Sequence, residues 1–291
     1  MLVKDIKVGV LGSGTMGIQL SLFFHANNIK VVTWNHKIDE NFHKKFNKLL
    51  KVNTRLGNLK KNTYSNELLY TDKLEELSDC DIVIESIKED KGAKLKILKR
   101  IDDILINPKV IATNTSTISI NELAEGMKHK SIFIGTHFFN PILSLKLVEI
   151  IKGINTKEHA ITYASDFLTK LGRYCVLVSD TPGFVVNRLL FLMINESINM
   201  IDEKVLDVKG IDGCMKLGAN HNMGPLELAD LIGLDVCLSI LKTLFEKTGD
   251  SKYMPAIMLV KNVDNGKLGK KSGNGFYQYL DSTNKCTIKR K

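Results

Sequence analysis

A glycine-rich turn, Gly12-Ser13-Gly14-Thr15-Met16-Gly17, lies between a strand-like and a helix-like segment near the start of the sequence. An apolar run over 6–11 precedes the turn, an amphipathic stretch over 16–27 follows it, and a second strand-like run spans 30–34. A strand, a glycine loop, a helix and a strand within about 30 residues are typical of a βαβ unit. We therefore predict that this unit binds a dinucleotide, although a strand–helix turn without a ligand has the same local pattern.

Each glycine of the turn has its own role in such a unit. Gly12 permits the tight turn, Gly14 lets the backbone approach a pyrophosphate, and Gly17 allows the helix to pack closely on the strand. The free N–H groups at the start of the helix favour phosphate binding. The whole loop, with Ser13, Thr15 and Met16, is therefore a candidate cofactor site.

The residue at the end of the second strand bears on which nicotinamide cofactor is bound. An acidic residue usually stands about 20 residues beyond the loop and bonds the adenosine ribose. Here that place holds Asn35, followed by His36 and Lys37. Asparagine is able to bond a 2′-hydroxyl and does not repel a 2′-phosphate, which Lys37 would attract. We expect NAD as the cofactor and leave NADP open.

Strand-like and helix-like segments alternate over the first part of the chain. This alternation favours an α/β fold with a Rossmann-like, doubly wound, mostly parallel sheet. Further strands are predicted at 82–84, 110–112, 132–135, 145–151 and 174–178, helices at 91–104, 120–125 and 157–171, and a polar helical region around Phe42, Phe46, Leu49 and Leu50.

The pattern changes at Asp180-Thr181-Pro182-Gly183, beyond which long helices but no clear strands are readable. We therefore predict a dinucleotide-binding domain over 1–182 and an all-α C-terminal domain over 183–291.

Two helices of the second domain are predicted individually. The run 184–200 is apolar nearly all round, which indicates a buried helix. Pro225 is expected to open another helix that ends near Thr248, with Gly249 as its stop.

The composition excludes several classes of protein. No apolar run approaches the ~20 residues that span a bilayer, and the start, Met1-Leu2-Val3-Lys4-Asp5, lacks the layout of a signal peptide. The formal net charge is +9, but lysines and acids are interspersed, and only Lys289-Arg290-Lys291 forms a short basic tail. Because nucleic-acid binding needs a clustered basic patch, we predict neither a nucleic-acid nor a membrane partner.

The cysteines point to the compartment. Cysteine occurs five times, scattered and without a CxxC pair, at Cys80, Cys175, Cys214, Cys237 and Cys286. This usage argues against a disulfide framework or a zinc site. We therefore expect a reducing, cytoplasmic compartment and no bound metal.

Polar residues that suit dehydrogenase chemistry follow the ends of the later strands, in the segments 114–117, 137–141 and 146–151. Ligands of open α/β sheets bind beyond the carboxyl ends of strands, where Ser116 and His137 fall. Oxidation of an alcohol needs a base, and histidine titrates near neutrality. An imidazole works better as a base when a carboxylate holds its second nitrogen. Strand alternation puts Glu149 on the same face as Leu147 and Ile151. From these residues alone, a packed core histidine and a surface charge at a bend remain alternative readings.

A family resemblance gives these residues a context. Its motifs are residues 12–17, Asn114-Thr115-Ser116, His137-Phe138-Phe139-Asn140-Pro141, Lys146-Leu147-Val148-Glu149, residues 181–188, Met223-Gly224-Pro225-Leu226-Glu227-Leu228 and residues 270–277. In this order they resemble the 3-hydroxyacyl-CoA dehydrogenase family over essentially the whole chain. Around 218–221 and 248–253 the chain is most similar to the short bacterial 3-hydroxybutyryl-CoA dehydrogenases.

The resemblance implies an activity and the residues that perform it. The reaction is hydride transfer with NAD(P) between a (3S)-3-hydroxyacyl-CoA, such as 3-hydroxybutanoyl-CoA, and a 3-oxoacyl-CoA, such as acetoacetyl-CoA, in fatty acid and butanoate metabolism. His137 is implied as the general acid/base, Glu149 as its orienting carboxylate, and Ser116 and Asn187 as contacts of the 3-oxygen or the thioester. The expected cofactor contacts beyond the glycine loop are Asn35, Glu85, Asp90, Asn140 and Lys271. The helical domain is expected to close over the substrate and to form a homodimer or higher homo-oligomer.

The chain departs from the family pattern at two places. Asn35 replaces the common Asp, which puts a strict preference for NAD in doubt. The segment 40–60, where relatives contact CoA, does not align cleanly; Lys48 and Lys51 are candidates for the CoA phosphates, with a solvated helix face as the alternative.

Two other functions share parts of this pattern. A related dehydrogenase of a free hydroxy acid or sugar acid would carry the same glycine loop. A binding protein that kept the fold without catalysis is disfavoured by the intact Ser116, His137, Asn140, Glu149 and Asn187.

Overall fold

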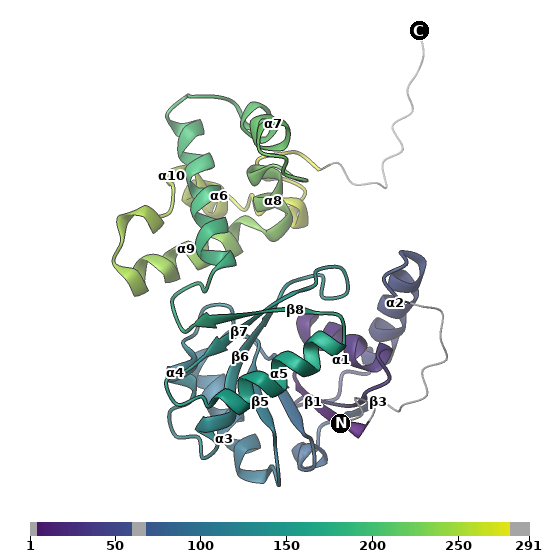
Figure 1. Ribbon diagram of the computed structural model, residues 1–291. Coiled ribbons are helices and arrows are strands. Elements are labelled where there is room, and N and C mark those ends of the chain that lie inside the picture. Colours follow the sequence, from purple (N-terminus) through teal and green to yellow (C-terminus); the bar gives the residue numbers. More distant parts are fainter. Residues whose placement is uncertain (1–4, 60–67, 280–291) are drawn as a thin grey trace. The chain divides into compact units, whose positions relative to one another are not determined.

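The computed structural model describes residues 5–59 and 68–279 (Figure 1). The chain divides into two compact units, residues 1–184 and residues 185–291. The division falls after Phe184, whereas the sequence places it after residue 182. The basic tail 289–291, Cys286 and Lys60 lie outside the described residues.

Unit 1 is built on one eight-stranded sheet in the order β3-β2-β1-β4-β5-β6-β7-β8. Neighbouring strands run parallel, except that β6 and β7 pair antiparallel. The predicted Rossmann-like, mostly parallel sheet is therefore confirmed. The strands are β1 (Lys7–Leu11), β2 (Lys30–Trp34), β3 (Leu68–Thr71), β4 (Ile82–Glu85), β5 (Val110–Thr113), β6 (Phe133–Phe138), β7 (Leu147–Lys152) and β8 (Tyr174–Ser179).

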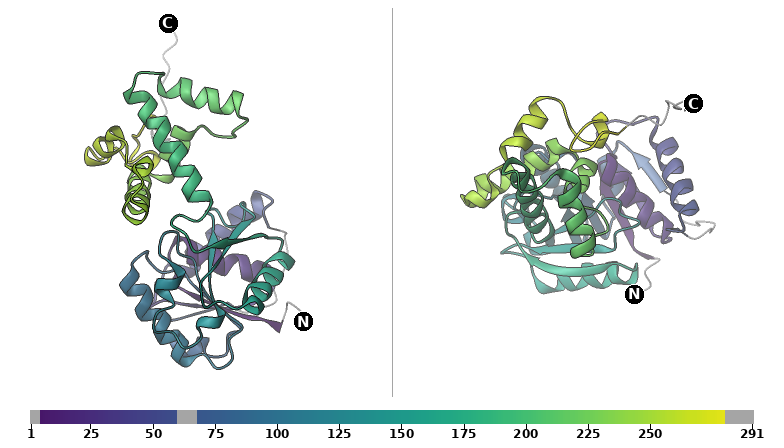
Figure 2. Two further views of the ribbon diagram at one scale, coloured as in Figure 1. Left: turned by 60° about the vertical axis from the view of Figure 1, so that its left-hand side comes forward. Right: turned by 90° about the horizontal axis from the view of Figure 1, so that it is seen from above.

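Helices cover both faces of this sheet (Figure 2). On one face α1 and α5 bury Leu20, Phe24 and Phe167 against the strands, and on the other α3 and α4 bury Leu98 and Leu123. Because the strands are apolar on both sides, they read in the sequence as continuous hydrophobic runs. The helices are α1 (Thr15–Ala26), α2 (Phe42–Arg55), α3 (Lys91–Ile104), α4 (Ile120–Leu123) and α5 (Glu158–Lys170), with short 3₁₀ turns η2 (Leu74–Leu77) and η3 (Lys130–Ile132).

One strand of the sheet was not predicted. β3 spans only Leu68–Thr71 and pairs with β2 at the edge of the sheet. It is half-buried, and Leu69 is exposed. A four-residue edge strand without apolar alternation carries little periodic signal.

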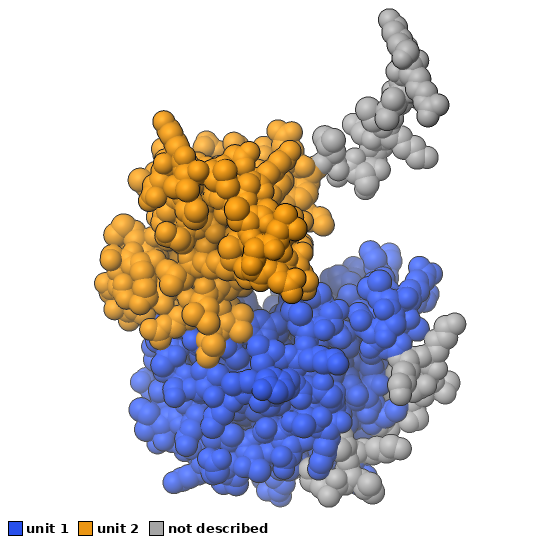
Figure 3. All heavy atoms as spheres, turned by 45° about the horizontal axis from the view of Figure 1, so that its top comes forward, with its two compact units in different colours: residues 1–184 blue, residues 185–291 orange. Residues whose placement is uncertain are grey.

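Unit 2 is coloured orange in Figure 3, and its described residues are mainly helical. Its described residues form no strand beyond two isolated bridges, Gly269 with Asn274 and Asn274 with Gln278, so the predicted helical domain is confirmed. The helices are α6 (Val186–Asp202), α7 (Val208–Gly218), α8 (Pro225–Ile232), α9 (Leu234–Thr248) and α10 (Ile257–Asp264), with 3₁₀ turns η4 (Ser251–Tyr253) and η5 (Lys270–Ser272).

The single helix predicted from Pro225 to Thr248 is wrong. Gly233 has a φ of 107° and separates α8 from α9. Residues that carry a Cβ rarely adopt this backbone conformation. The glycine therefore allows a sharp break inside an apolar stretch. The predicted ends are confirmed, because Pro225 opens α8 and Gly249 follows the last residue of α9.

The helix predicted over 184–200 is confirmed as α6, which begins at Val186, and its predicted burial is confirmed for most of its length. α6 buries Phe191, Ile194 and Ile198 in the core of the unit. Leu189 on the same helix is 65% exposed. One apolar face is therefore buried in this unit, and Leu189 is a large apolar side chain that α6 leaves exposed.

Candidate active site

The glycine loop follows β1 directly and leads into α1. The N–H of Gly12 donates to the carbonyl oxygen of Trp34 at 2.8 Å, which joins the loop to the end of β2. Gly12 has a φ of 109°, and a Cβ at this position would lie 2.6 Å from the carbonyl oxygen of Ser86. A Cβ on Gly17 would collide with the carbonyl oxygen of Gly12. Glycine therefore fits at both positions where a larger residue does not.

The N-terminus of α1 is open to an anionic ligand. Gly14 is the N-cap residue, no side chain caps the helix, and no acid lies in its first turn. A Cβ added to Gly14 would meet nothing within 4 Å. Uncapped N–H groups at a helix start bind phosphate well, so these residues fit the pyrophosphate of a dinucleotide.

Asn35 lies directly after β2, where its backbone N–H donates to the carbonyl oxygen of Thr71 at 3.0 Å. Its Nδ2 donates to the carbonyl oxygen of Lys37 at 2.8 Å, which leaves Oδ1 as an acceptor. Nearby, the hydroxyl of Tyr70 lies 3.4 Å from the Oγ of Ser13 in the glycine loop. The predicted ribose subsite thus carries neutral polar groups from the loop, β2 and β3.

The central contact of unit 1 pairs His137 of β6 with Glu149 of β7. The two residues stand opposite each other in the antiparallel register, with 2.7 Å between His137 Nδ1 and Glu149 Oε2. Their side chains are 5% and 1% exposed. The other ring nitrogen, Nε2, lies 3.1 Å from the Oγ of Ser116. Glu149 is therefore not a surface charge, and His137 has a polar partner at each nitrogen.

This arrangement fixes the chemistry available to the imidazole. Because the buried carboxylate of Glu149 accepts hydrogen bonds, Nδ1 carries the proton in neutral His137, and Nε2 is the basic nitrogen. The rings of Phe139 and Phe184 lie 4.5 Å and 5.6 Å from the imidazole, measured between centroids. The imidazole is thus held in one orientation and is able to take up a proton at Nε2, with Glu149 balancing the charge.

Two asparagines lie at the ends of neighbouring strands. Asn114 Oδ1 accepts from the backbone N–H of Phe138 at 2.9 Å and so joins the end of β5 to β6. Asn140 is exposed just beyond β6, and its Oδ1 accepts from Nε2 of Gln19 at 2.9 Å. The predicted Asn140 is therefore bonded to the helix that follows the glycine loop.

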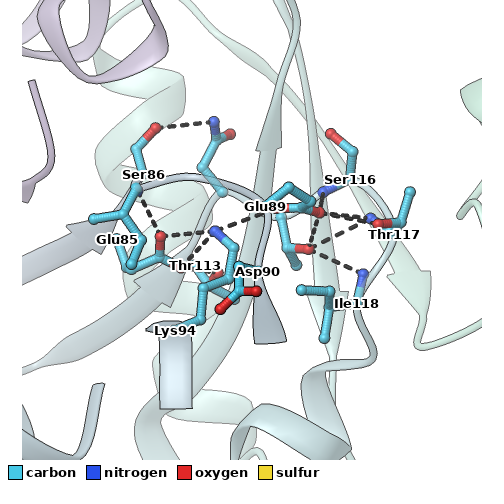
Figure 4. Close-up of polar contacts among 12 residues, drawn as sticks. Glu85, Ser86, Glu89, Asp90, Lys94, Thr113, Ser116, Thr117 and Ile118 are labelled. Carbon is cyan, nitrogen blue, oxygen red and sulfur yellow. Dashed lines mark hydrogen bonds and ion pairs between the residues drawn. The ribbon is translucent and has the colours of Figure 1, made fainter. Parts of the chain in front are cut away.

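Glu89, which the sequence did not single out, holds the loop that carries Ser116 (Figure 4). Its Oε1 accepts from the backbone N–H groups of Ser116 and Thr117 at 2.9 Å and 3.1 Å, and from Thr115 Oγ1 at 2.5 Å. Burial raises the pKa of the Glu89 carboxyl, but the charge of Lys94 and these hydrogen bonds outweigh burial and leave the pKa below its ordinary value. Glu89 is therefore ionised at neutral pH, and it orders the turn that places Ser116.

The predicted cofactor contacts Glu85 and Asp90 both have partners within unit 1. Glu85 is fully buried, and its carboxylate accepts from Lys94 Nζ at 2.7 Å and 2.9 Å and from Thr113 Oγ1 at 2.6 Å (Figure 4). Asp90 is the N-cap of α3 and accepts from the N–H of Ala93 at 2.7 Å. Glu85 thus anchors β4 to α3 and β5, and direct contact of either residue with a cofactor stays a prediction.

The buried ion pair had a signal in the sequence. Lys94 stands on the apolar stripe of α3 with Ile97, Leu98 and Ile101, and all four are buried. A lysine in such a stripe needs a buried anionic partner. Glu89 carries no comparable signal, because it lies in the connection between β4 and α3 and acts on a turn distant in the sequence.

The remaining predicted residues lie in different parts of the chain. Asn187 is 7% exposed in the first turn of α6, in unit 2. Lys271, also in unit 2, donates to Asp235 Oδ2 at 2.6 Å. Lys48 and Lys51 are exposed on α2 of unit 1.

Neither a metal site nor a membrane-spanning helix is found among the described residues. Among residues 5–59 and 68–279, no group of three or more His, Cys, Asp and Glu side chains is placed to hold a metal ion. In the same ranges, no helix combines the length and the apolar character needed to cross a membrane.

Comparison with known protein families identifies both units. The 3-hydroxyacyl-CoA dehydrogenase NAD-binding domain matches residues 7–181, and the C-terminal domain of the same family matches residues 183–279. The chain belongs to the 3-hydroxyacyl-CoA dehydrogenase family. The resemblance seen in the motifs is therefore confirmed, and the chain is an oxidoreductase with an NAD-binding domain.

Individual relatives agree with the family. A 3-hydroxybutyryl-CoA dehydrogenase of Clostridioides difficile is 39% identical over 280 residues, covering 94% of this chain and 99% of that one. One of Bradyrhizobium diazoefficiens is 46% identical over 212 residues, which are 73% of this chain and 72% of the relative. The crystal structure of (S)-3-hydroxybutyryl-CoA dehydrogenase from Ralstonia eutropha superposes with a TM-score of 0.88 at 36% identity, covering 94% of this chain and 99% of the other.

Proposed function

We propose that this dehydrogenase interconverts a (3S)-3-hydroxyacyl-CoA, with 3-hydroxybutanoyl-CoA as the expected substrate, and the corresponding 3-oxoacyl-CoA. The observation that carries the proposal is His137, held by Glu149 on one nitrogen and next to Ser116 on the other. Relatives that are named 3-hydroxybutyryl-CoA dehydrogenases support this substrate class. The bound dinucleotide supplies a hydride acceptor in one direction and a hydride donor in the other.

The residues of unit 1 handle the proton of the reaction. In the oxidation, Nε2 of His137 takes the proton of the 3-hydroxyl as C3 loses its hydride and the carbonyl forms. Glu149 stabilises the imidazolium that results. Ser116 Oγ, 3.1 Å from Nε2, donates to the 3-oxygen, and Asn187 is assigned as a further substrate contact on the family resemblance. In the reduction the same proton returns from His137 to the 3-oxygen.

Binding of the two large ligands is assigned to separate segments. The glycine loop and the start of α1 hold the pyrophosphate, and Asn140 lies toward the nicotinamide end. Lys271 in unit 2 is a further cofactor contact, and the exposed ammonium groups of Lys48 and Lys51 bind CoA phosphates.

The assembly and the compartment belong to the same proposal. We infer a homodimer or higher homo-oligomer, supported by the large apolar side chains exposed on unit 2, such as Leu189 at 65% and Leu217 at 91%. A cytoplasmic location is supported by the free thiols of the described cysteines, Cys80, Cys175, Cys214 and Cys237.

The proposal is tested by initial rates of NADH oxidation with acetoacetyl-CoA and with acetoacetate in parallel. We expect turnover of the thioester and none of the free acid, because the CoA moiety supplies binding energy that the small acid lacks. Turnover of acetoacetate alone would point to a dehydrogenase of free hydroxy acids. NADH binding without turnover of any acyl-CoA would point to a protein that kept only the fold.

The cofactor preference is expected to depend on Asn35. We propose that NAD(H) is the main cofactor and that NADP(H) is tolerated, because Asn35 places no negative charge beside the 2′-oxygen. Asn35→Asp should lower kcat/KM for NADPH about tenfold or more relative to NADH, since a carboxylate accepts from a 2′-hydroxyl and repels a 2′-phosphate. The measurement is the ratio of the two kcat/KM values. Asn265→Asp, the same change at an exposed residue of unit 2, is the control, and an unchanged ratio in Asn35→Asp contradicts the role.

A further inference from the structure

Gln19 is a buried polar side chain on α1, the helix that begins at the glycine loop. It is 7% exposed, and its amide forms three hydrogen bonds within unit 1. Nε2 donates to the carbonyl oxygen of Thr15 at 3.2 Å and to Asn140 Oδ1 at 2.9 Å. Oε1 accepts from the backbone N–H of Ile142 at 3.0 Å. One side chain thus joins the phosphate-binding helix to the segment that follows β6.

The backbone partners determine which way this amide faces. The N–H of Ile142 is only a donor, so it requires the oxygen of Gln19, and the carbonyl of Thr15 is only an acceptor, so it requires the nitrogen. Gln19 therefore presents an N–H to Asn140. Asn140 has to accept this hydrogen bond with its Oδ1. Its Nδ2 then lies on the opposite side of the amide as a donor.

Asn140 lies where the orientation of an amide matters for catalysis. It follows His137 by three residues at the carboxyl end of β6, and it is exposed there. Since ligands of such sheets bind beyond the carboxyl ends of the strands, the exposed amide of Asn140 stands at the edge where a cofactor binds. An outward Nδ2 attracts a carbonyl oxygen, whereas an outward Oδ1 would repel it.

We propose that Gln19 is a positioning residue, which sets the amide of Asn140 as a hydrogen-bond donor toward an oxygen at the nicotinamide end of the cofactor. This inference rests on the proposed function, in which Asn140 lies toward the nicotinamide. Gln19 itself touches neither cofactor nor substrate in this scheme. It acts by fixing the side chain of Asn140, and through Ile142 the course of the chain behind it.

The isosteric change Gln19→Glu separates orientation from packing. A carboxylate still accepts from Ile142 but has no proton for Asn140 or for Thr15. Asn140 then has to turn its Nδ2 inward and expose Oδ1. When the introduced carboxyl is protonated it regains a donor, so the effect of the substitution is reversible with pH. Gln19→Leu removes both donor and acceptor and has no pH-dependent rescue.

The experiment measures binding and turnover in the full-length protein. Trp34, the single tryptophan, lies at the end of β2, and its emission reports the binding of NADH and of ADP-ribose, which lacks the nicotinamide. At about pH 8, Gln19→Glu should raise the Kd for NADH and lower kcat/KM for NADH about tenfold, the effect of one misdirected hydrogen bond, with the Kd for ADP-ribose unchanged. Toward about pH 5.5 the ratio of variant to wild type should return toward one. Gln278→Glu, at an exposed glutamine, is the matched control.

Three results overturn the inference. If Gln19→Glu weakens the binding of NADH and of ADP-ribose equally, Gln19 is only a packing residue. The same conclusion follows if the loss of kcat/KM in Gln19→Glu is the same at every pH and equals the loss in Gln19→Leu. Unchanged NADH binding in Gln19→Glu at about pH 8 removes its role altogether. Failure of the proposed function can be told apart from failure of this inference. If the wild-type protein turns over no acyl-CoA, the Kd values for NADH and for ADP-ribose can still be compared between the wild type and Gln19→Glu.

Discussion

Replacing His137 by asparagine is expected to lower kcat for acetoacetyl-CoA reduction by about 10²–10⁴-fold, the range typical of a general acid/base. Asparagine keeps polar atoms near Glu149 and Ser116, but it is unable to give a proton to the 3-oxygen. The side chain of His137 is 5% exposed and bonded on both nitrogens, so its loss removes the proton route. The Kd for NADH, measured through Trp34 emission, should be nearly unchanged.

The chain offers a matched control for this substitution. His129 Nδ1 lies 2.7 Å from Asp102 Oδ1, the same distance as between His137 Nδ1 and Glu149 Oε2, and its side chain is 40% exposed. His129 precedes the amino end of β6, however, whereas His137 lies near its carboxyl end. Because ligands bind at the carboxyl ends, His129→Asn should leave kcat within the range of the wild type.

The outcomes of the His137 experiment are distinct. A variant that binds NADH normally and keeps full turnover of acetoacetyl-CoA would disprove the assignment of His137 as the acid/base. Loss of NADH binding together with turnover would indicate a folding defect, and His137→Gln would then be measured as the second variant.

The glycine loop and its flanks were predictable because their information is local. β1, α1 and β2 lie within about a residue of their predicted bounds, since apolar runs, a helical repeat and glycines at fixed spacing all agree there. Gly12 and Gly17 stand where the backbone approaches itself too closely for a Cβ. The steric requirement for glycine at these two positions can therefore be read directly from the sequence.

The pairing of His137 with Glu149 was only partly predictable. The sequence indicated both residues, but their contact depends on the antiparallel register of β6 and β7. A shift of one residue in that register would send Glu149 to the other face of the sheet. Family motifs, rather than periodicity, connected the two residues.

Glu89, Gln19 and the break at Gly233 were not predictable from local patterns. Glu89 bonds a turn 26 to 28 residues further along, and Gln19 bonds residues more than 120 positions away. Gly233 interrupts a stretch whose apolar character continues on both sides. Such features depend on which segments the fold brings together, and sequence spacing does not encode that.

The second large effect is expected in stability, at Lys94. Its Nζ is held by both oxygens of Glu85 at 2.7 Å and 2.9 Å and lies 3.3 Å from Glu89 Oε2. The side chains of Lys94 and Glu85 are 1% and 0% exposed. Lys94→Met should lower the free energy of unfolding by about 3–5 kcal/mol, because it leaves a buried carboxylate without its counter-ion. Urea unfolding of the variant and the wild type measures the change.

The neighbouring Lys96 provides the control on the same helix. It is exposed on α3, so Lys96→Met should change the free energy of unfolding by no more than about 0.5 kcal/mol. If Lys94→Met also changes the free energy of unfolding by no more than about 0.5 kcal/mol, the ion pair of Lys94 with Glu85 does not stabilise the fold.

The double variant Glu85→Gln with Lys94→Met distinguishes lost charge pairing from lost packing. Once the carboxylate of Glu85 is replaced by an amide, the fully buried charge is removed, and the amide oxygen still accepts from the backbone N–H of Ile87, now bonded to Glu85 Oε1 at 2.7 Å. The double variant should therefore be more stable than Lys94→Met alone, with a coupling energy of about 0.5–3 kcal/mol.

Because Lys94 also contacts Glu89, Lys94→Met should loosen the turn of Ser116 and lower kcat, whereas Lys96→Met should not. A stability loss without any change in kcat would mean that Glu89 holds the turn without help from Lys94.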